Sequence, residues 1–168
     1  MSYTICRAER SQLPQILKIY ADARQYMRDT GNPNQWGADR PEEATLREDI
    51  AKGQLYLCMD TQQILGVFAY IPGIDPTYLV IEGGQWLNEA PYGVIHRIAV
   101  AQHQKGVASF CFRWALEQCP DLRIDTHHDN LPMQKALAKN GFTRCGIIYL
   151  ANGDPRIAYH KTMTTATM

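Results

Sequence analysis

The stretch from Tyr92 to Glu117 constrains the fold most, because it joins a strand pattern to a helix pattern through a short polar loop. Residues 92–100 alternate and are rich in β-branched side chains, which predicts a strand. Apolar residues then recur at the spacing of one helix face, at Val107, Phe110, Cys111, Trp114 and Ala115. A helix N-terminus with unpaired N–H groups can hold a phosphate. Gly106 would let the backbone approach it closely, and Lys105 adds a positive charge.

Composition narrows the class of protein. The 168 residues carry 17 basic and 17 acidic side chains, so we expect neither a nucleic-acid partner nor a membrane partner. No apolar run approaches the roughly 18 residues that span a bilayer, and the first seven residues lack a signal-peptide core. The five cysteines form no Cys-x-x-Cys motif, which fits unpaired thiols in a reducing cytosol. We therefore expect a cytoplasmic protein with one domain over residues 1–168.

The remaining patterns predict the order β-α-α-β-β-(β)-β-α-β-α-β-β. The other predicted strands are Tyr3–Arg7, Leu55–Met59, Ile64–Ile71, the uncertain segment Tyr78–Ile81, Leu122–Thr126, Phe142–Leu150 and Arg156–Lys161. The other predicted helices run from a Ser11 cap to Thr30, from Pro41 to Gly53 and from Pro132 to Asn140. Residues 162–168 are predicted to fray. This order favours an α/β domain in which helices pack on a mixed sheet.

In its element order and in three motifs, the chain resembles the GNAT superfamily of acyl-CoA-dependent N-acyltransferases. Residues 105–108 resemble the end of that family's Q/R-x-x-G-x-G/A pyrophosphate loop. Asn130, followed by Gly141 and Phe142, resembles its second motif, and residues 145–150 with the hairpin after them resemble its closing strand pair. The resemblance implies a mixed, mostly antiparallel sheet splayed around the cofactor and flanked by helices. It also implies acetyl-CoA as co-substrate and no metal.

The resemblance also implies which residues hold the cofactor. These are Ile98, Ala99, Val100, His103, Gln104, Lys105, Gly106, Val107, Ala108, Ser109, Asn130 and Met133. Three positions depart from the family pattern. His103 stands where Gln or Arg is preferred, and Gln104 stands where a first glycine often sits. Leu137 replaces a tyrosine that many members use as general acid, so another group supplies the proton or the thiolate leaves unaided.

Direct acetyl transfer needs a held thioester, a deprotonated amine and donors for the oxyanion. His96 lies four residues before Val100, where some arylalkylamine-acetylating members place a histidine, and it is the candidate base. A structural histidine in the sheet is the alternative. Glu82 is the rival base, with a solvated loop carboxylate as its alternative. Tyr149 and Cys145 are candidate proton donors, which core packing explains equally well.

The acceptor is expected to meet Gln35, Trp36, Glu82 and Trp86, polar-loop or aromatic residues outside the cofactor half of the chain. Either tryptophan could instead cap the core. Strand alternation should place His96, Ile98 and Val100 on one face. The acidic and histidine residues from Asp125 to Asp129 predict no metal site, because alternation would separate their side chains.

The resemblance, taken with these candidate residues, implies transfer of an acetyl group from acetyl-CoA to a primary amine of a small molecule, by direct attack in a ternary complex. Two alternatives stay open. One is a non-catalytic acyl-CoA-binding sensor, which Leu137 favours. The other is acetylation of a protein or peptide N-terminus. Whether the protein forms a homodimer also stays open.

Overall fold

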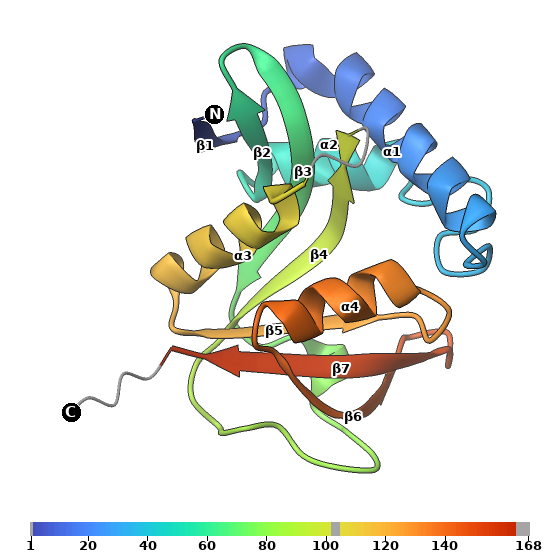
Figure 1. Ribbon diagram of the computed structural model, residues 1–168, viewed down its shortest axis with the longest axis vertical. Helices are drawn as coiled ribbons and strands as arrows, with labels where there is room; N and C mark the ends of the chain where they lie inside the picture. Colours follow the sequence, from blue (N-terminus) through green and yellow to red (C-terminus); the bar gives the residue numbers. More distant parts are fainter. Residues whose placement is uncertain (1, 102–104, 164–168) are drawn as a thin grey trace.

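The computed structural model describes residues 2–101 and 105–163 (Figure 1). The strands are β1 (Tyr3–Arg7), β2 (Leu55–Asp60), β3 (Gln63–Pro72), β4 (Gly93–Val100), β5 (Asp121–Thr126), β6 (Thr143–Tyr149) and β7 (Pro155–Thr162). The helices are α1 (Leu13–Asp29), α2 (Glu43–Ala51), α3 (Val107–Gln118) and α4 (Leu131–Lys139), with short 3-10 helices η1 (Arg10–Gln12) and η2 (Pro76–Tyr78). Apart from the bracketed strand, the predicted order of elements is confirmed.

Local chemistry explains three differences from the sequence prediction. Tyr78–Ile81 is not a strand, because Asp75 caps η2 by accepting a hydrogen bond from the Thr77 N–H. Ser11 is not the cap before α1, since Glu9 caps η1 through a reciprocal hydrogen-bond pair with Gln12. Thr162 ends β7 and does not belong to a frayed tail, and residues 164–168 lie outside the described residues.

The seven strands form one mixed, mostly antiparallel sheet in the order β1-β2-β3-β4-β5-β7-β6. Only β4 and β5 run parallel, and they pair at just two positions, Gly93 with Leu122 and Val94 with Arg123. Beyond those two positions, Figure 1 shows β4 running obliquely away from β5 and β7. The sheet is therefore split at its centre, as the family resemblance implied.

Helices cover both faces of this split sheet. On one face, α3 and α4 share a core that includes Phe112, Leu137 and Phe142. On the other, α1 and α2 pack on β2 and β3 around Ile16, Leu46 and neighbouring apolar residues. In the described part of the chain, no helix is both long enough and apolar enough to cross a membrane.

The long connection of residues 73–92 covers the face of β5, β6 and β7 opposite α4. Tyr78 and Tyr92 pack there against Val94, Ile148 and Ala158. The Trp86 indole N–H donates to the Tyr78 carbonyl at 3.0 Å, and Glu82 forms an isolated antiparallel bridge with Ile147 of β6. The path of this connection places the Asp75–Tyr78 segment beside β4, where Asp75 and Tyr78 contact His96.

Candidate active site at the split between β4 and β5

A cavity lies where β4 and β5 part. From Ile95 onward, the edge of β4 that faces β5 has no strand partner in the described chain. The cavity has a volume of about 500 Å³ and is lined by β4, β5, the first turn of α4, the loop after α1 and the β6–β7 hairpin. Small-molecule sites typically have volumes of roughly 300–1,000 Å³. The cavity is thus the right size for a small ligand.

A bulge in β4 shapes one wall of the cavity. Arg97 has a positive φ of 57°, and the register with β3 shifts beside it. The Tyr20 hydroxyl donates to the Arg97 carbonyl at 2.6 Å, and the Arg97 guanidinium donates to both oxygens of buried Asp49 at 2.9 and 3.0 Å. These contacts hold a backbone conformation that is uncommon for a non-glycine residue.

The bulge corrects the expected alternation of side chains along β4. Ile98 and Val100 pack toward the core under α3, whereas Ala99 belongs to the core under α1 and α2. His96 instead contacts Tyr78 and Asp75 on the face of the 73–92 connection. An extra residue in one strand reverses the faces beyond it, so His96 does not share a face with Ile98 and Val100.

His96 lines the cavity and is held by a carboxylate. Its Nε2 lies 2.8 Å from Asp75 Oδ2, and its side chain remains 25% exposed. The other Asp75 oxygen accepts from the Thr77 N–H at 2.9 Å and the Thr77 hydroxyl at 2.7 Å. Burial works to raise the pKa of Asp75, but the hydrogen bonds from His96 and Thr77 outweigh it and lower that pKa to about 2. Asp75 is therefore ionised across the physiological pH range.

Asp75 was not among the site residues predicted from the sequence. The spacing Asp75-Pro76-Thr77 signals a helix cap. Nothing local connects that cap to His96, which lies 21 residues further along the chain. Only the path of the 73–92 connection brings the two together.

Gln35 and Trp36, two of the residues predicted to contact the amine substrate, line this cavity. Gln35 Oε1 accepts hydrogen bonds from the side-chain amides of Asn32 and Asn130, both at 2.9 Å. The Trp36 ring meets Tyr20 edge-on at 5.5 Å between centroids. The loop after α1 is thus tied directly to the start of α4 across the cavity.

The predicted cofactor residues divide into two groups. Ile98, Asn130 and Met133 line the cavity itself. Asn130 also caps α4, because its Oδ1 accepts from the Met133 N–H at 3.1 Å. Ala99 is buried in the α1-side core, and Val100 packs against the core under α3.

The second group forms the start of α3. Gly106 is its N-cap with a positive φ of 82°, and no side chain caps this end within the described residues. Val107 is buried, and its Cγ1 lies so close to β3 that a Cβ at Gly66 would approach it to 2.8 Å. Ala108 and Ser109 are partly exposed, and Lys105 is exposed. The structure does not describe His103 and Gln104, so their predicted roles lie outside the described residues.

The described features fit a long ligand with amides and phosphates. Beyond Val94, the β5-facing edge of β4 has no strand partner in the described chain, so its backbone can pair with a ligand. The start of α3, which no described side chain caps, offers N–H groups suited to an anion. The buried Thr126 hydroxyl lines the cavity and has no hydrogen-bond partner in the described chain. A buried hydroxyl without a partner is costly, and a ligand amide would satisfy it.

Other predicted residues lie outside this cavity. The Tyr149 hydroxyl donates to Glu82 at 2.9 Å on the protein surface. Trp86 lines a separate cavity of about 750 Å³, where the buried guanidinium of Arg123 lies between the Trp86 and Tyr92 rings. Cys145 is buried, and burial raises the pKa of its thiol. The structure does not bring these groups to His96.

Leu137, the position where many GNAT members carry a tyrosine, is fully buried in the core under α4. It offers no polar atom to the cavity. Leu137 therefore cannot supply the proton for the departing thiolate, and which group does so stays a prediction.

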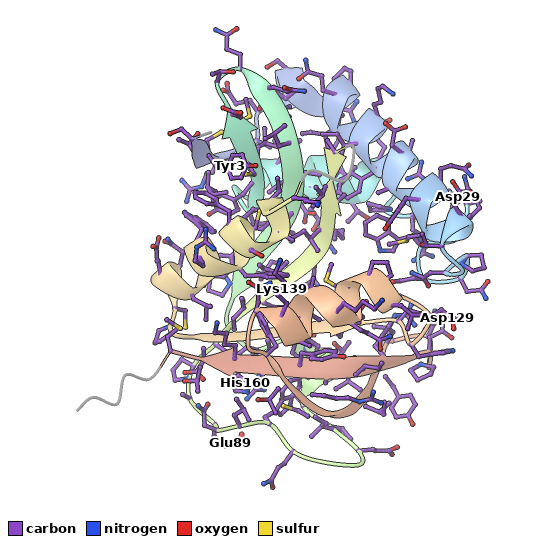
Figure 2. All side chains as sticks on the ribbon, in the orientation of Figure 1. Tyr3, Asp29, Glu89, Asp129, Lys139 and His160 are labelled. Atoms are coloured by element: carbon purple, nitrogen blue, oxygen red, sulfur yellow. The ribbon has the colours of Figure 1, made fainter. Side chains whose placement is uncertain are left out.

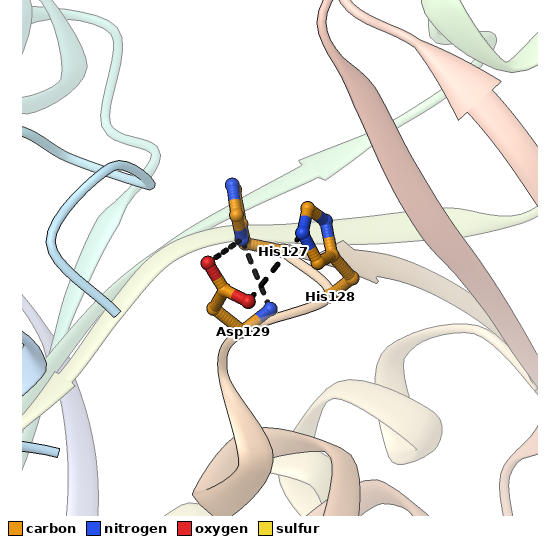
Figure 3. A group of neighbouring side chains, drawn as sticks. All are labelled: His127, His128 and Asp129. Carbon is orange, nitrogen blue, oxygen red and sulfur yellow. Dashed lines mark hydrogen bonds and ion pairs between the residues drawn. The ribbon is translucent and has the colours of Figure 1, made fainter. Parts of the chain in front are cut away.

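Figure 3 shows the cluster of His127, His128 and Asp129, whose potential metal-ligand atoms lie within 4.8 Å of one another. The cluster lies in the turn after β5, so strand alternation does not separate these side chains as expected. His127 Nδ1 already accepts the Asp129 backbone N–H at 3.0 Å, and the two imidazoles stack at 4.3 Å with 25° between their planes. Ring lone pairs lie in the ring planes, so this arrangement does not aim both histidines at one ion.

Comparisons with known proteins agree with this geometry. A GNAT-family acetyltransferase from Streptococcus agalactiae has a TM-score of 0.87 and 29% identity, with 95% of each chain covered. This likeness supports the assignment of the chain to the GNAT superfamily. A second GNAT-family acetyltransferase, from Listeria monocytogenes, is similar at a TM-score of 0.69, 17% identity and coverage of 96% of this chain and 95% of that one.

A third structure similar to this chain is Arabidopsis thaliana Naa50 in complex with the bisubstrate analogue CoA-Ac-MVNAL. Its TM-score is 0.62 at 15% identity, with coverage of 97% of this chain and all of that one. No family model and no curated protein sequence matches the chain. The likenesses support acetyl transfer as the general class of activity and leave the acceptor undetermined.

Proposed function

We propose that this protein transfers an acetyl group from acetyl-CoA to a primary amine of a small molecule, with His96 as the general base. The observation that carries the proposal is the position of His96 in the cavity between β4 and β5. Its Nε2 is engaged by Asp75, and Nδ1 has no hydrogen-bond partner in the described chain. A base needs such an available lone pair within reach of the proton that it removes.

Acetyl-CoA would supply the activated acyl group as a thioester. The edge of β4 from Ile98 to Val100 and the Thr126 hydroxyl would hold its amide arm. The backbone N–H groups at the start of α3, with Lys105 nearby, would hold its phosphates. No metal has a part in this proposal.

The residues around His96 would prepare the amine. Amines bind protons near neutral pH, so a proton must leave before the nitrogen can attack. His96 Nδ1 would take that proton directly or through one water. The exposed carboxylates of Asp39 and Glu42 line the cavity without an ion-pair partner in the described residues, and they outnumber the exposed Arg40 beside them. The other two cations of the lining are Arg97, which is neutralised by Asp49, and the buried Arg156, which has Asp125 and Asp154 nearby. A cationic amine is therefore the favoured acceptor.

The loop after α1 supports a small acceptor over a peptide. Asn130 and Arg156 both hold Gln35 in place, the latter through a 3.4 Å hydrogen bond to the Gln35 carbonyl. A peptide N-terminus needs an open groove for the residues behind it. Because this loop lines the cavity and is fixed at Gln35, it would narrow a groove on its side of the cavity.

The test is release of free thiol from acetyl-CoA with a panel of amines: tryptamine, phenethylamine, spermidine, lysine and a tetrapeptide with a free N-terminus. We expect turnover with at least one small amine and less with the tetrapeptide. Fastest turnover with the tetrapeptide would assign the protein to N-terminal acetylation. Thermal stabilisation by acetyl-CoA with no thiol release for any amine would instead identify a sensor.

A further inference from the structure

Asp75 is held more firmly than an ordinary loop carboxylate. Its Oδ1 accepts both the N–H and the hydroxyl of Thr77, and its own N–H donates to the Tyr92 hydroxyl at 3.0 Å. Only Oδ2 is left for His96. Each oxygen of Asp75 therefore has a fixed partner.

This arrangement determines the protonation of the His96 ring. An ionised carboxylate only accepts hydrogen bonds, so the Nε2 atom at 2.8 Å must carry a hydrogen. A neutral imidazole carries one N–H, which leaves Nδ1 with the free lone pair. Nδ1 has no other hydrogen-bond partner within residues 2–101 and 105–163.

We propose that Asp75 is a positioning residue that keeps His96 in the Nε2–H tautomer, so that Nδ1 is the atom that accepts the proton of the amine. The proposal rests on the proposed function of His96 as base. It adds which nitrogen acts and which residue selects it.

Because Thr77 donates two hydrogen bonds to Asp75, two substitutions at Asp75 should have different effects on His96. In Asp75→Asn, the amide oxygen must stay toward Thr77, since both Thr77 groups donate. The amide NH₂ would then face His96 Nε2, which must accept, and the ring proton would move to Nδ1. Asparagine caps helices as well as aspartate does, so η2 is retained.

Asp75→Ala acts differently. It removes the cap and leaves His96 free to adopt both tautomers. A purely structural Asp75 would make the alanine variant the more damaged enzyme. A positioning Asp75 makes the asparagine variant the less active one, although it is the better folded.

The direct readout is the ¹⁵N spectrum of imidazole-labelled protein at pH 8, with His96 assigned by comparison with His96→Gln. We expect Nε2–H in the wild type and Nδ1–H in Asp75→Asn. A wild-type spectrum that shows the proton on Nδ1 overturns the proposal, whether or not the variants fold.

Turnover is measured with the most active amine of the panel, alongside acetyl-CoA thermal shifts and an Asp22→Asn control on the exposed face of α1. Asp75→Asn should lower kcat by about 10²–10⁴, the range reported for a wrong tautomer or a lost base, and leave the thermal shift intact. Asp75→Ala should lower kcat by a smaller factor, and Asp22→Asn should have the kcat of the wild type. An asparagine variant as active as the alanine variant would refute the role of Asp75.

His96→Ala separates this inference from the function on which it rests. If His96→Ala turns over like the wild type, the assignment of His96 as base fails, and the role of Asp75 fails with it. If His96→Ala is impaired while Asp75→Asn keeps its tautomer and its turnover, only the inference about Asp75 fails.

Discussion

Two histidine–aspartate pairs among the described residues have the same separation and different surroundings. His96 Nε2 and Asp75 lie 2.8 Å apart beside the cavity, with 25% and 15% of their side chains exposed. His160 Nε2 and Asp121 also lie 2.8 Å apart, but are 0% and 5% exposed. Figure 2 shows His160 on β7, with Glu89 of the 73–92 connection nearby in the same view.

The second ring nitrogen distinguishes the two pairs. His160 Nδ1 accepts the Leu87 N–H at 3.2 Å, and Asp121 also accepts from the Asn88 side chain at 2.8 Å. Both His160 nitrogens are therefore occupied, and the pair fastens the 73–92 connection to the sheet. His96 keeps one nitrogen unoccupied beside a cavity. The distance within a pair thus does not separate the two histidines, whereas the state of the remaining nitrogen does, and it is the basis on which we propose His96 as the base.

The largest expected effect is on the rate of His96→Ala. Loss of a general base should lower kcat/KM by about 10²–10⁴. Its stability and its thermal shift with acetyl-CoA should stay close to those of the wild type, because His96 is partly exposed. Steady-state thiol release and thermal melts measure the two properties. Full turnover in His96→Ala would mean that His96, like His160, has no part in catalysis.

The complementary change, His160→Ala, should act on stability. It leaves the buried carboxylate of Asp121 without its histidine donor, and a buried acceptor left without its partner costs about 1–3 kcal/mol, or more when it is charged. Urea unfolding measures the loss, and turnover per folded molecule should be unchanged at temperatures well below the melting transition. Lost activity in fully folded His160→Ala would contradict the comparison.

A smaller effect is expected on acetyl-CoA affinity, and it should differ between two glycines of similar conformation. Gly106 and Gly31 have φ values of 82° and 87°, and a Cβ at either would meet nothing within 4 Å. Alanine at either position should cost about 1–2 kcal/mol in the left-handed conformation. Only Gly106→Ala should also weaken acetyl-CoA binding, measured by calorimetry. If Gly106→Ala and Gly31→Ala bound acetyl-CoA equally well, the cofactor phosphates would not lie at the start of α3.

The smallest effect is the pH dependence of stability. Burial lowers the pKa of His160 below its usual 6.5, and burial together with Arg156 does the same for His127. Since the unfolded chain binds these protons more readily, stability is complete above about pH 6.5 and falls as the pH drops toward the folded-state pKa values. Each group contributes a slope of at most about 1.4 kcal/mol per pH unit. Urea unfolding between pH 5 and 8 should show a smaller slope in His160→Ala.

Local patterns were enough to predict most helices and strands. The periodicities that give β4 and α3 are properties of adjacent residues. The bulge at Arg97 was not predictable in this way, because its partners Asp49 and Tyr20 lie 48 and 77 residues away in the chain. A straight strand was the natural expectation, and it misplaced His96 relative to Ile98.

The candidate site was predictable in part for the same reason. Asn130 and Met133, which motif order marked as cofactor residues, line the cavity, and so does Trp36, which was marked as an aromatic residue in a polar loop. Their predicted roles stay predictions. Glu82 and Trp86 lie elsewhere, because long-range contacts set the path of the 73–92 connection. These contacts are the bridge from Glu82 to Ile147 and the stacking of Arg123 on Trp86. Asp75, the partner of His96, is positioned by the same connection.

The central claim is that acetyl transfer takes place in the gap between β4 and β5 beside His96. A crystal structure with CoA and the most active amine of the panel tests it most directly. We predict CoA along the open edge of β4, with the amine nitrogen within about 2.6–3.2 Å of His96 Nδ1 or linked to it by one water. An amine bound away from His96, or a ring whose Nδ1 faces the protein interior, would contradict this account.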